Sequence, residues 1–402
     1  MGRLPVITAG LSTAILLSSC ADAEPNAESD SAVGAASTPA SADTDTSSAS
    51  EDGEPFTVEE QGSYDSPWAL EFLPGTEQML ITTRTGELLL RSTEDSTDAA
   101  ETSVEGLPED IVVDGQGGLG DVVVAPDFED SQRVYLSWVA SGDGGTGAVV
   151  GHARLVVSGS SAELQDLTVI WEQRPKTSGS GHFSHRLAFS PDGEHLFVTS
   201  GDRQQMSPAQ DLASGLGKVM RLTPEGEPAD GNPFAEEGGV SSEIWTWGHR
   251  NPLGIDVTED GQLWVSEMGP EGGDELNLLQ EGENYGWPEA SNGSHYGGGD
   301  IPDHSEADGF AAPATSWTPS ISPGSLMIYQ GELFSDWTGD AVMGALSGQA
   351  LVRVDLDGQS AGEEQIWDMG ARIRDVEEAP DGSIWVVEDG DGAALLRLTP
   401  PD

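Results

Sequence analysis

The sequence predicts an all-β fold, a six-bladed β-propeller whose blades are four-stranded antiparallel sheets. Short apolar segments alternate with turns rich in Gly and Asp, and no stretch shows a long helical periodicity. A turn with Pro or Asp and Gly, followed by an alternating apolar strand, also recurs along the chain. Radial repetition of small sheets protects strand edges, so this repeat favours a propeller over a large β-sandwich.

Each copy of the repeat predicts one blade and marks the turn into an inner or central strand. The fifth copy is looser than the others. In chain order the copies lie at residues 73–81, 125–136, 190–198, 259–265, 336–343 and 379–386. About 350 residues divided among six blades leaves roughly 58 for each, enough for four strands and functional loops.

The N-terminus predicts an exported lipoprotein. Residues 1–19 combine Arg3 with an apolar run and then Leu17-Ser18-Ser19-Cys20, which resembles a bacterial lipobox. Cys20 is the only cysteine, so it is the expected lipid attachment point and the domain has no internal disulfide. Residues 20–54 carry few large apolar side chains and predict a disordered tether before a domain at 55–402. We therefore expect a protein held to the extracytoplasmic side of the membrane only through Cys20, although an ordinary cleaved signal is the alternative.

The charge of the chain excludes several partners. Of 402 residues, 71 are acidic and 16 are Lys or Arg, which gives a formal net charge of −55. Phosphate recognition needs a basic face, so we expect no nucleic-acid partner. The acidic excess is typical of proteins that stay soluble in salty or extracellular surroundings.

Two segments are candidates for a catalytic site, one with a histidine and the other with an arginine. His182 precedes a predicted strand, and Asp202 follows that strand, so the carboxylate can orient the imidazole as a general base. A plain Asx turn at Asp202 is the alternative. Arg250 and Asn251 end an aromatic strand, where a guanidinium suits oxygens that gain negative charge. The acidic, Gly-rich loop 266–275 suits a hard cation such as Ca²⁺, or is simply solvated.

An ordered set of motifs resembles the soluble glucose/sorbosone dehydrogenase family, whose members are pyrroloquinoline quinone (PQQ) dependent aldose sugar dehydrogenases on six-bladed propellers. The resemblance spans about residues 60–400. Its motifs are Asp-Gly-Gln-Gly-Gly-Leu (114–119), Gly-His-Arg-Asn-Pro (248–252), Ser-Glu-Met-Gly-Pro (266–270), Gly-Gly-Asp-Glu-Leu-Asn (272–277), Asn-Tyr-Gly-Trp-Pro (284–288) and Arg-Ile-Arg-Asp-Val (372–376), with the His182 loop and Gly201-Asp202.

The resemblance implies oxidation of aldose sugars at the anomeric carbon to lactones, with hydride passing to PQQ. In that reading His182 is the general base, Asp202 orients it, and Arg250 stabilises charge on the quinone. The further cofactor or substrate contacts implied are Gln116, Asn251, Tyr296, Arg372 and Arg374. The carbonyls of Gly269 and Pro270 complete a calcium held by PQQ, and Glu275 with the carbonyl of Tyr285 matches a second calcium site.

Two departures separate this chain from glucose dehydrogenases. A cofactor-contacting Lys of those enzymes falls on Ser347, which leaves Ser347 or Gln349 as its replacement. The insertion that caps the site and supports dimers is also shortened, so we expect a monomer with a broad aldose range and an electron acceptor that the sequence does not specify. Two other classes stay open: a calcium-dependent lactonase-type hydrolase, and a non-catalytic binding propeller on the cell surface.

Overall fold

The computed structural model describes residues 54–401 except positions 95, 98 and 306. The predicted signal peptide, Cys20 and the predicted tether up to residue 53 lie outside the described residues. The chain divides into Met1–Asp52 and the compact unit Gly53–Asp402, which carries every described element. No helix in this described part is long and apolar enough to cross a membrane.

The described structure is almost entirely β-sheet, which confirms the predicted all-β class. Within it, four sheets have four antiparallel strands, one has eight strands and one is a two-stranded ribbon. The eight-stranded sheet consists of two antiparallel runs, β2–β5 and β6–β9, joined by a short parallel pairing of β5 with β9. Four short helical segments lie in the connections: α1 (Phe128–Ser131), η1 (Ser207–Gln210), η2 (Ala235–Glu237) and η3 (Gly239–Glu243).

The strands follow the chain in runs of four. The first two runs are β2 (Pro67–Phe72), β3 (Gln78–Thr83), β4 (Glu87–Ser92), β5 (Glu101–Glu105), and β6 (Leu119–Val124), β7 (Arg133–Gly142), β8 (Gly145–Ser158), β9 (Ser161–Glu172). The next two are β10 (Ser184–Phe189), β11 (Leu196–Ser200), β12 (Lys218–Leu222), β13 (Ile244–Trp247), and β14 (Pro252–Val257), β15 (Leu263–Glu267), β17 (Asp274–Leu279), β19 (Thr315–Trp317). The last two are β20 (Met327–Ile328), β21 (Ala341–Ala345), β22 (Ala350–Asp357), β23 (Ser360–Asp368), and β24 (Ile373–Glu378), β25 (Ile384–Glu388), β26 (Ala393–Thr399), β1 (Thr57–Tyr64). The ribbon pairs β16 (Glu271–Gly272) with β18 (Gly293–Ser294).

The recurring turn of the sequence joins the first and second strands of each run. Three copies are closed by the same bond, in which a glycine N–H donates to the carbonyl three residues earlier. These bonds measure 2.8 Å from Gly193, 2.9 Å from Gly261 and 2.8 Å from Gly382. The three glycines have φ of 72°, 88° and 82°, a conformation that other residues adopt only at a cost, so glycine is favoured at this position in these three copies.

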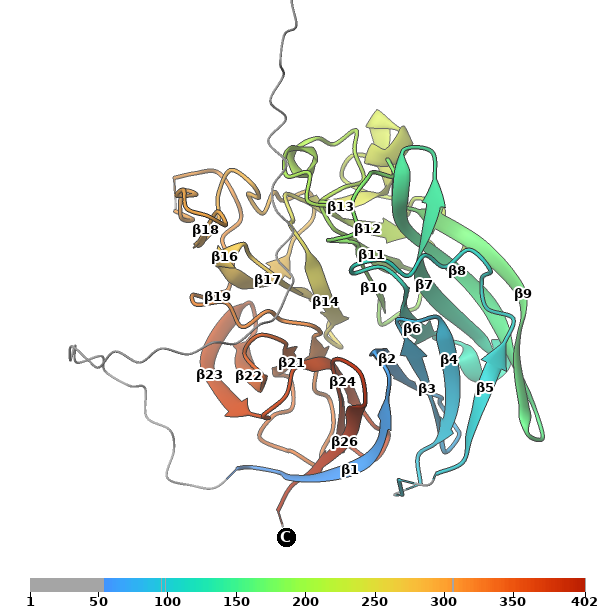
Figure 1. Cartoon of the computed structure of the whole chain (residues 1–402). Coiled ribbons are helices and arrows are strands. Elements are labelled where there is room, and N and C mark those ends of the chain that lie inside the picture. Colours follow the sequence, from blue (N-terminus) through green and yellow to red (C-terminus); the bar gives the residue numbers. More distant parts are fainter. Residues whose placement is uncertain (1–53, 95, 98, 306, 402) are drawn as a thin grey trace, which may run out of the picture. The chain divides into compact units, whose positions relative to one another are not determined.

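The first strands of the runs form a closed ring, and the arrangement is that of a β-propeller. Contacts pass from β2 to β6, β10, β14, β20, β24 and back to β2. Figure 1 shows β2, β6, β10, β14 and β24 gathered around the middle, with later strands farther out. The last sheet is completed by the pairing of β1 with β26, which runs from Thr57 opposite Thr399 to Tyr64 opposite Ala393.

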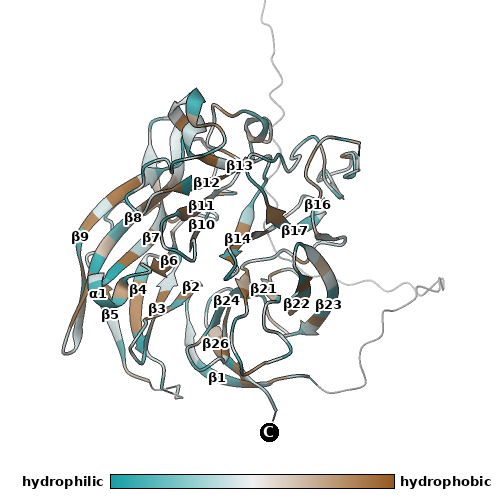
Figure 2. Ribbon diagram, turned by 180° about the vertical axis from the view of Figure 1, so that it is seen from behind, coloured by the Kyte–Doolittle hydropathy of each residue, from teal (hydrophilic) through white to brown (hydrophobic). Residues whose placement is uncertain are grey.

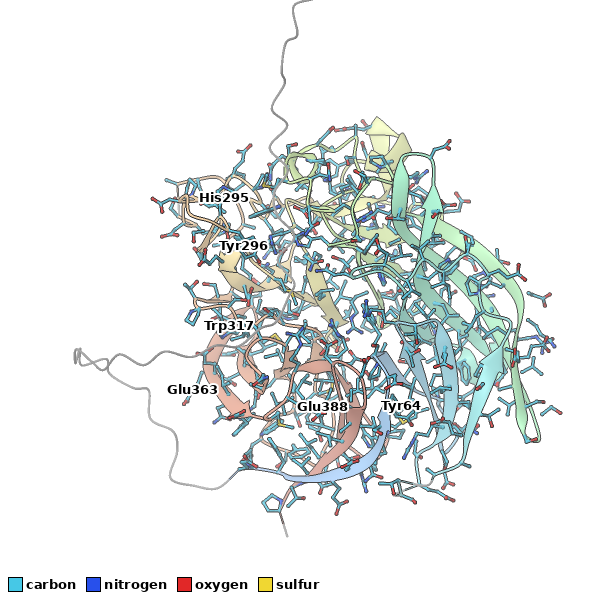
Figure 3. The ribbon with its side chains drawn as sticks, viewed as in Figure 1. Tyr64, His295, Tyr296, Trp317, Glu363 and Glu388 are labelled. Atoms are coloured by element: carbon cyan, nitrogen blue, oxygen red, sulfur yellow. The ribbon has the colours of Figure 1, made fainter. Side chains whose placement is uncertain are left out.

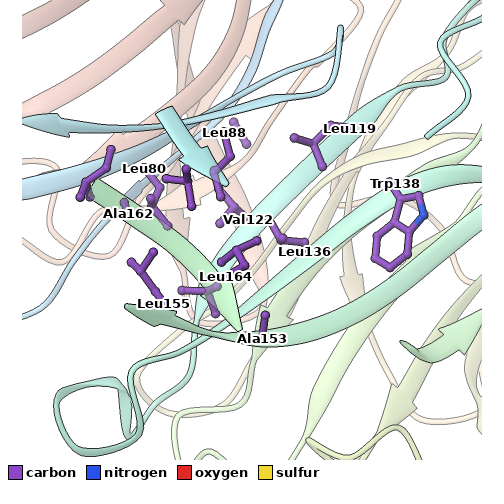
Figure 4. Close-up of a cluster of buried hydrophobic side chains, with 14 of the residues drawn as sticks. Leu80, Leu88, Leu119, Val122, Leu136, Trp138, Ala153, Leu155, Ala162 and Leu164 are labelled. Atoms are coloured by element: carbon purple, nitrogen blue, oxygen red, sulfur yellow. The ribbon is translucent and has the colours of Figure 1, made fainter. Parts of the chain in front are cut away.

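Apolar side chains fill the spaces between neighbouring sheets. The largest cluster unites β2–β9 and includes Leu80, Val122, Leu136, Trp138 and Leu155, all buried (Figure 4). Figure 2 shows hydrophobic segments on the strands and more hydrophilic residues in many connecting loops. Burial of this kind stabilises the fold by roughly 25 cal/mol for each Å² of apolar surface removed from water.

The ring surrounds an axial cavity of about 60 Å³. Its wall is strongly acidic and contains one arginine, Arg186, on β10. The Arg186 guanidinium lies 3.0 Å from the Asp121 carboxylate of β6 and 2.9 Å from the Asp375 carboxylate of β24. It also stacks on the ring of Trp68 from β2 at 4.0 Å. It therefore links β10 to three other strands of the ring.

Two further contacts extend the links of Arg186 to the remaining sheets. Its Nε donates to the carbonyl of Leu253 in β14 at 2.9 Å, and its Nη2 donates to the carbonyl of Gly324, just before β20, at 2.8 Å. One buried side chain thus touches all the strand runs that meet at the axis. The axial arginine is a feature that we did not predict from the sequence.

Another carboxylate at the axis, that of Glu71, should give the stability of the protein an unusual pH dependence. Burial raises the pKa of Glu71 to about 8, so the folded protein holds a proton that the unfolded chain releases near pH 4.5. The contribution of Glu71 to stability is therefore fully present below pH 4.5 and is lost as the pH rises towards 8. Glu71→Gln should remove this loss and raise the free energy of unfolding at pH 8.5 by about 1–2 kcal/mol, since solvent in the cavity reduces the full value.

The matched control for Glu71→Gln is Glu87→Gln, which removes the same charge from an exposed position on β4. Urea unfolding at pH 5 and pH 8.5 measures both variants. A Glu71→Gln variant that loses as much stability between these two pH values as the wild type does would contradict the prediction.

Candidate functional site

The predicted site residues come just before the first strands of different runs. Gln116 precedes β6, His182 precedes β10, Arg250 precedes β14, and Arg372 precedes β24. The His182 N–H donates to the Gln116 side chain, and the Asp202 N–H donates to the Arg250 carbonyl at 2.8 Å, so the starts of β6, β10 and β14 lie at the same end of the ring. Residues that precede them therefore meet at one end of the ring.

His182 and Asp202 form a buried pair. The His182 Nδ1 lies 2.7 Å from the Asp202 Oδ1, as the sequence predicted. Burial, and next the charge of Arg250, lower the pKa of His182 below its ordinary value. Although burial alone would raise it, the hydrogen bond and charge of His182 lower the pKa of Asp202. The imidazole is therefore neutral near pH 7 and the carboxylate is ionised.

Asp202 has more partners than its predicted role requires. Its Oδ1 also accepts from the Gln204 N–H at 2.8 Å, so the Asx turn named as the alternative coexists with the histidine contact. Its Oδ2 accepts from the Trp287 Nε1–H at 2.8 Å and from the Met206 N–H at 3.2 Å. The carboxylate is thereby fixed in one orientation, and it fixes the ring of His182 in turn.

The backbone around His182 is strained. His182, Ser184 and His185 have φ of 50°, 60° and 61°, in the left-handed region. The facing segment is similar, with φ of 56° at Arg203 and 58° at Met206. Conformations of this kind cost of order 1–3 kcal/mol each and cluster at functional sites.

Two contacts hold the His182 backbone in this conformation. The His182 N–H donates to the Gln116 Oε1 at 2.7 Å, so the predicted cofactor contact Gln116 here positions the base. Gly201 permits the close approach from the other side, because a Cβ there would lie 2.1 Å from the His182 carbonyl oxygen.

Arg250 is buried beside this pair. Its Nη1 donates to the carbonyls of Met268 at 3.0 Å and Gly269 at 2.7 Å. Its guanidinium carbon lies 5.3 Å from the centre of the Trp287 ring and 5.7 Å from that of the Tyr296 ring. Arg250 therefore joins the His182–Asp202 pair to the 268–270 loop.

Two neighbours of Arg250 differ in burial. Asn251 is buried, and its Oδ1 accepts from the Ser184 hydroxyl at 3.0 Å. Tyr296 is 65% exposed, next to His295 in the loop that follows β18 (Figure 3). The exposed ring extends over the guanidinium from outside, which is consistent with the predicted place of Tyr296 beside a ligand.

Arg372 and Arg374 share one carboxylate. The Arg372 Nε donates to the Asp389 Oδ2 at 2.8 Å, and Arg374 donates to the Asp389 Oδ1 from Nη2 at 2.7 Å. The three groups together carry one net positive charge. No contact among the described residues joins either arginine to His182, so these two lie at the predicted end of the ring without touching the pair.

Ser347 reaches the 268–270 loop through a chain of hydrogen bonds. Its hydroxyl donates to the Ser322 Oγ at 2.8 Å, and the Ser322 N–H donates to the Asp274 Oδ2 at 2.6 Å. The Asp274 Oδ1 accepts from the Gly269 N–H at 2.8 Å. Ser347 is exposed, whereas Asp274 is fully buried.

Of the predicted metal-binding residues, Gly269, Glu275 and Tyr285 lie around a small cavity of about 10 Å³. It is lined by oxygen-bearing groups that include Glu267, Gly269, Glu275 and Tyr285. A Cβ at Gly269 would lie 2.3 Å from the carbonyl oxygens of Gly272 and Gly273, so only glycine fits this tight loop. Pro270 is buried beside it. No group of three or more His, Cys, Asp or Glu side chains in the described part of the chain is arranged to hold a metal.

Glu275 has an incomplete set of partners. Its Oε2 accepts from Asn277 at 3.1 Å, and its Oε1 lies 3.5 Å from the His304 Nε2. Burial raises the pKa of Glu275, and the charge of Glu267 adds to this. The Asn277 Oδ1 and both ring nitrogens of His304 are buried without a hydrogen-bond partner.

Three residues of the site were missed by the sequence analysis. Trp287 lies in the quoted motif 284–288, but only its bond to Asp202 shows its importance. Glu267 accepts from the Arg250 N–H at 2.8 Å and lies 2.9 Å from His249 Nδ1, so it anchors the arginine loop. Asp389 follows a predicted strand, and no sequence signal pairs it with Arg372.

Comparisons with known proteins show what the chain is similar to. The family model described as Glucose / Sorbosone dehydrogenase matches residues 64–397. The aldose sugar dehydrogenase YliI of Escherichia coli is 39% identical over 346 residues, which cover 85% of this chain and 91% of that protein.

Solved structures give the same result. The apo-form of the soluble aldose sugar dehydrogenase of E. coli has a TM-score of 0.80 at 38% identity, and the match covers 86% of this chain and 100% of that one. The PQQ-bound aldose sugar dehydrogenase of Streptomyces coelicolor has a TM-score of 0.71 at 27% identity, with 86% and 98% covered.

Proposed function

Because the chain belongs to the glucose/sorbosone dehydrogenase family and is an oxidoreductase acting on sugars, we propose that it is a quinoprotein that oxidises aldoses at the anomeric carbon to lactones. The observation that carries this proposal is the buried His182–Asp202 pair next to Arg250. The chain contains the complete set of groups that such an oxidation needs from a protein: a base, a group that orients it, and a cation.

His182 is the proposed general base. Its Nδ1 contacts the carboxylate of Asp202, so Nδ1 carries the proton and Nε2 carries the lone pair. Nε2 has no hydrogen-bond partner among the described residues and is free to take the proton of an anomeric hydroxyl. The lowered pKa keeps the imidazole neutral at neutral pH, as a base requires.

The cations at this end of the ring suit PQQ, which is a planar tricarboxylate. The cation candidates are Arg250, and Arg372 and Arg374 with one net charge after pairing with Asp389. In a chain of net charge −55 such a group favours an anionic ligand. Bound PQQ supplies the hydride acceptor. The residues proposed to hold it are Gln116, Arg250, Asn251, Tyr296, Ser347, Arg372 and Arg374.

The cavity beside Gly269 suits calcium. Ca²⁺ prefers carboxylate and carbonyl oxygens, and the cavity wall carries both, including two buried carboxylates, Glu267 and Glu275, that repel one another. We assign the carbonyls of Gly269 and Pro270 to a calcium that accompanies PQQ, and Glu275 with the carbonyl of Tyr285 to a second calcium. A cation would also relieve the repulsion between the carboxylates.

Reconstitution tests the function directly. Apoprotein supplied with PQQ and Ca²⁺ should develop the absorbance band of bound cofactor, and an aldose such as glucose or arabinose should bleach it. A lactonase-type hydrolase would instead open lactones with calcium alone. A binding propeller would give neither signal, and either outcome would overturn the proposal.

Removal of calcium should abolish this reconstitution, because an all-oxygen site without its cation leaves carboxylates to repel each other. Glu275→Gln should mainly lower the melting temperature and raise the calcium concentration needed for protection. The control is Glu271→Gln, an exposed acid of the same loop, which should resemble the wild type. Full activity of chelator-treated protein with PQQ alone would refute the calcium assignment.

Further proposals concern blade number, location and assembly. Counting the eight-stranded sheet as two runs gives six four-stranded blades. We propose that the protein is exported and held at the extracytoplasmic side of the membrane by lipid on Cys20, and that it works as a monomer with an electron acceptor still to be identified. A Cys20→Ser variant should move from the membrane fraction to the soluble fraction. Retention of the variant in the membrane fraction would disprove the anchor.

A further inference from the structure

Arg203 is a buried cation next to the site that neither the sequence analysis nor the comparisons assign. It follows Asp202 directly and is 1% exposed. Its guanidinium forms no ion pair with a carboxylate of the described residues. Instead its Nε donates to the Gly181 carbonyl at 2.9 Å, its Nη2 donates to the Gly179 carbonyl at 2.6 Å, and its plane stacks on Phe183 at 3.7 Å.

These contacts bracket His182 on both sides. Gly181 and Phe183 are its immediate neighbours, and the Arg203 N–H donates to the His182 carbonyl at 3.3 Å. The other end of the guanidinium is fixed to β8, where Nη1 donates to the Thr146 carbonyl. The loop that carries His182 is therefore tied through one side chain to a neighbouring sheet.

These hydrogen bonds counteract the backbone strain in the loop that carries His182. His182 at φ 50° and Arg203 at φ 56° lie in a conformation that relaxes unless surrounding contacts maintain it. Hydrogen bonds from a charged donor are among the strongest available for that task. A planar fork reaches several carbonyls at fixed angles, which a lysine ammonium does not.

We propose that Arg203 is a positioning residue that holds His182 in its reactive orientation through its contacts with the residues on both sides of it. The inference rests on the proposed function, in which His182 is the base. The charged groups that face His182 are Asp202, which favours the protonated imidazole, and Arg250 and Arg203, which disfavour it.

The test compares Arg203→Lys and Arg203→Met with the wild type. Arg203→Met loses both the fork and the charge, so turnover should fall about 10- to 100-fold, because small misplacement of a catalytic group costs on this scale. The pKa of His182, measured by NMR of the apoprotein, should rise. Arg203→Lys keeps the charge, so the pKa of His182 should stay near that of the wild type while turnover still falls. Binding of PQQ should change less than threefold in both variants.

The matched control is Arg221→Met. Arg221 lies on β12, and its guanidinium carbon is also stacked on an aromatic ring, 4.1 Å from the centre of Trp245. Its Nε donates to the Asn232 Oδ1 at 2.8 Å. Its loss should leave turnover and the pKa of His182 unchanged. The same effects in Arg221→Met as in Arg203→Met would assign both to general destabilisation and overturn the proposal.

Two outcomes separate failure of this inference from failure of the proposed function. Wild-type turnover in a folded Arg203→Met variant, with an unmoved pKa of His182, removes the role of Arg203 alone. Absence of PQQ-dependent activity in the wild type removes the function, and the NMR measurement then still tests the influence of Arg203 on His182. If Arg203→Met does not fold, Arg203→Lys and Phe183→Leu decide, and turnover within twofold of the wild type in both overturns the proposal.

Discussion

Replacing His182 with Gln is expected to lower turnover by about 10² to 10⁴, the usual worth of general base catalysis. Gln keeps a polar group of similar reach near Asp202 but has no lone pair of comparable basicity. Binding of PQQ should persist, because the cationic residues proposed to hold it are untouched. Single-turnover bleaching of the cofactor band measures the loss without interference from the unknown acceptor.

The pH profile provides an independent check on His182. Burial and Arg250 lower its pKa, so the acid limb of turnover should lie below pH 6.5, the ordinary value for histidine. His195→Gln is the control, since His195 lies in the turn between β10 and β11. Near-normal turnover in His182→Gln, or an acid limb above pH 7, would exclude His182 as the base.

Replacing Arg186 with Met is expected to cost about 3–5 kcal/mol of stability at pH 7. The carboxylates of Asp121 and Asp375 would remain buried at the axis without their cation, and such breakage of a buried pair is strongly destabilising. The loss should shrink at acidic pH, because protonation neutralises the two orphaned carboxylates. Urea unfolding at pH 5 and pH 7 measures both effects.

Two further variants show whether charge or geometry causes the loss in Arg186→Met. Arg186→Lys keeps the charge but cannot reach Leu253, Gly324 and both carboxylates at once, so its stability should be intermediate. Asp375→Asn combined with Arg186→Met should be less destabilised than the sum of the single variants. An Arg186→Met protein as stable as the wild type at pH 7 would show that the axial contacts contribute nothing.

Local sequence patterns were enough to predict the strands and the turns. The turn at Gly193 recurs at Gly261 and Gly382 because the same hydrogen bond needs the same positive φ each time. The His182–Asp202 pair was also predictable, since the start of β10 and the end of its antiparallel neighbour β11 lie at the same end of the sheet. The family resemblance supplied the remaining roles, and the comparisons confirmed the family.

Contacts between distant runs were not predictable. Arg186 reads as one charged residue in a strand, and nothing local shows that carbonyls 67 and 138 positions away will meet its guanidinium. Asp389 and Glu267 are similarly ordinary acids in a chain that contains 71 of them. In such an acidic sequence the few Lys and Arg residues are more informative than the acids. Arg203 shows that even for these residues the contacts become clear only in the structure.

The pairing of β1 with β26 has a consequence for how the protein is made. β1 pairs with β26, so the last sheet gains its fourth strand only after residues 393–399 have been synthesised. Until then the last sheet lacks its fourth strand, and this is the sheet that carries Arg374 on β24 and Arg372 just before β24. A chain arrested before residue 393 would thus carry His182, Arg250, Arg372 and Arg374 while the sheet behind the last two is still incomplete.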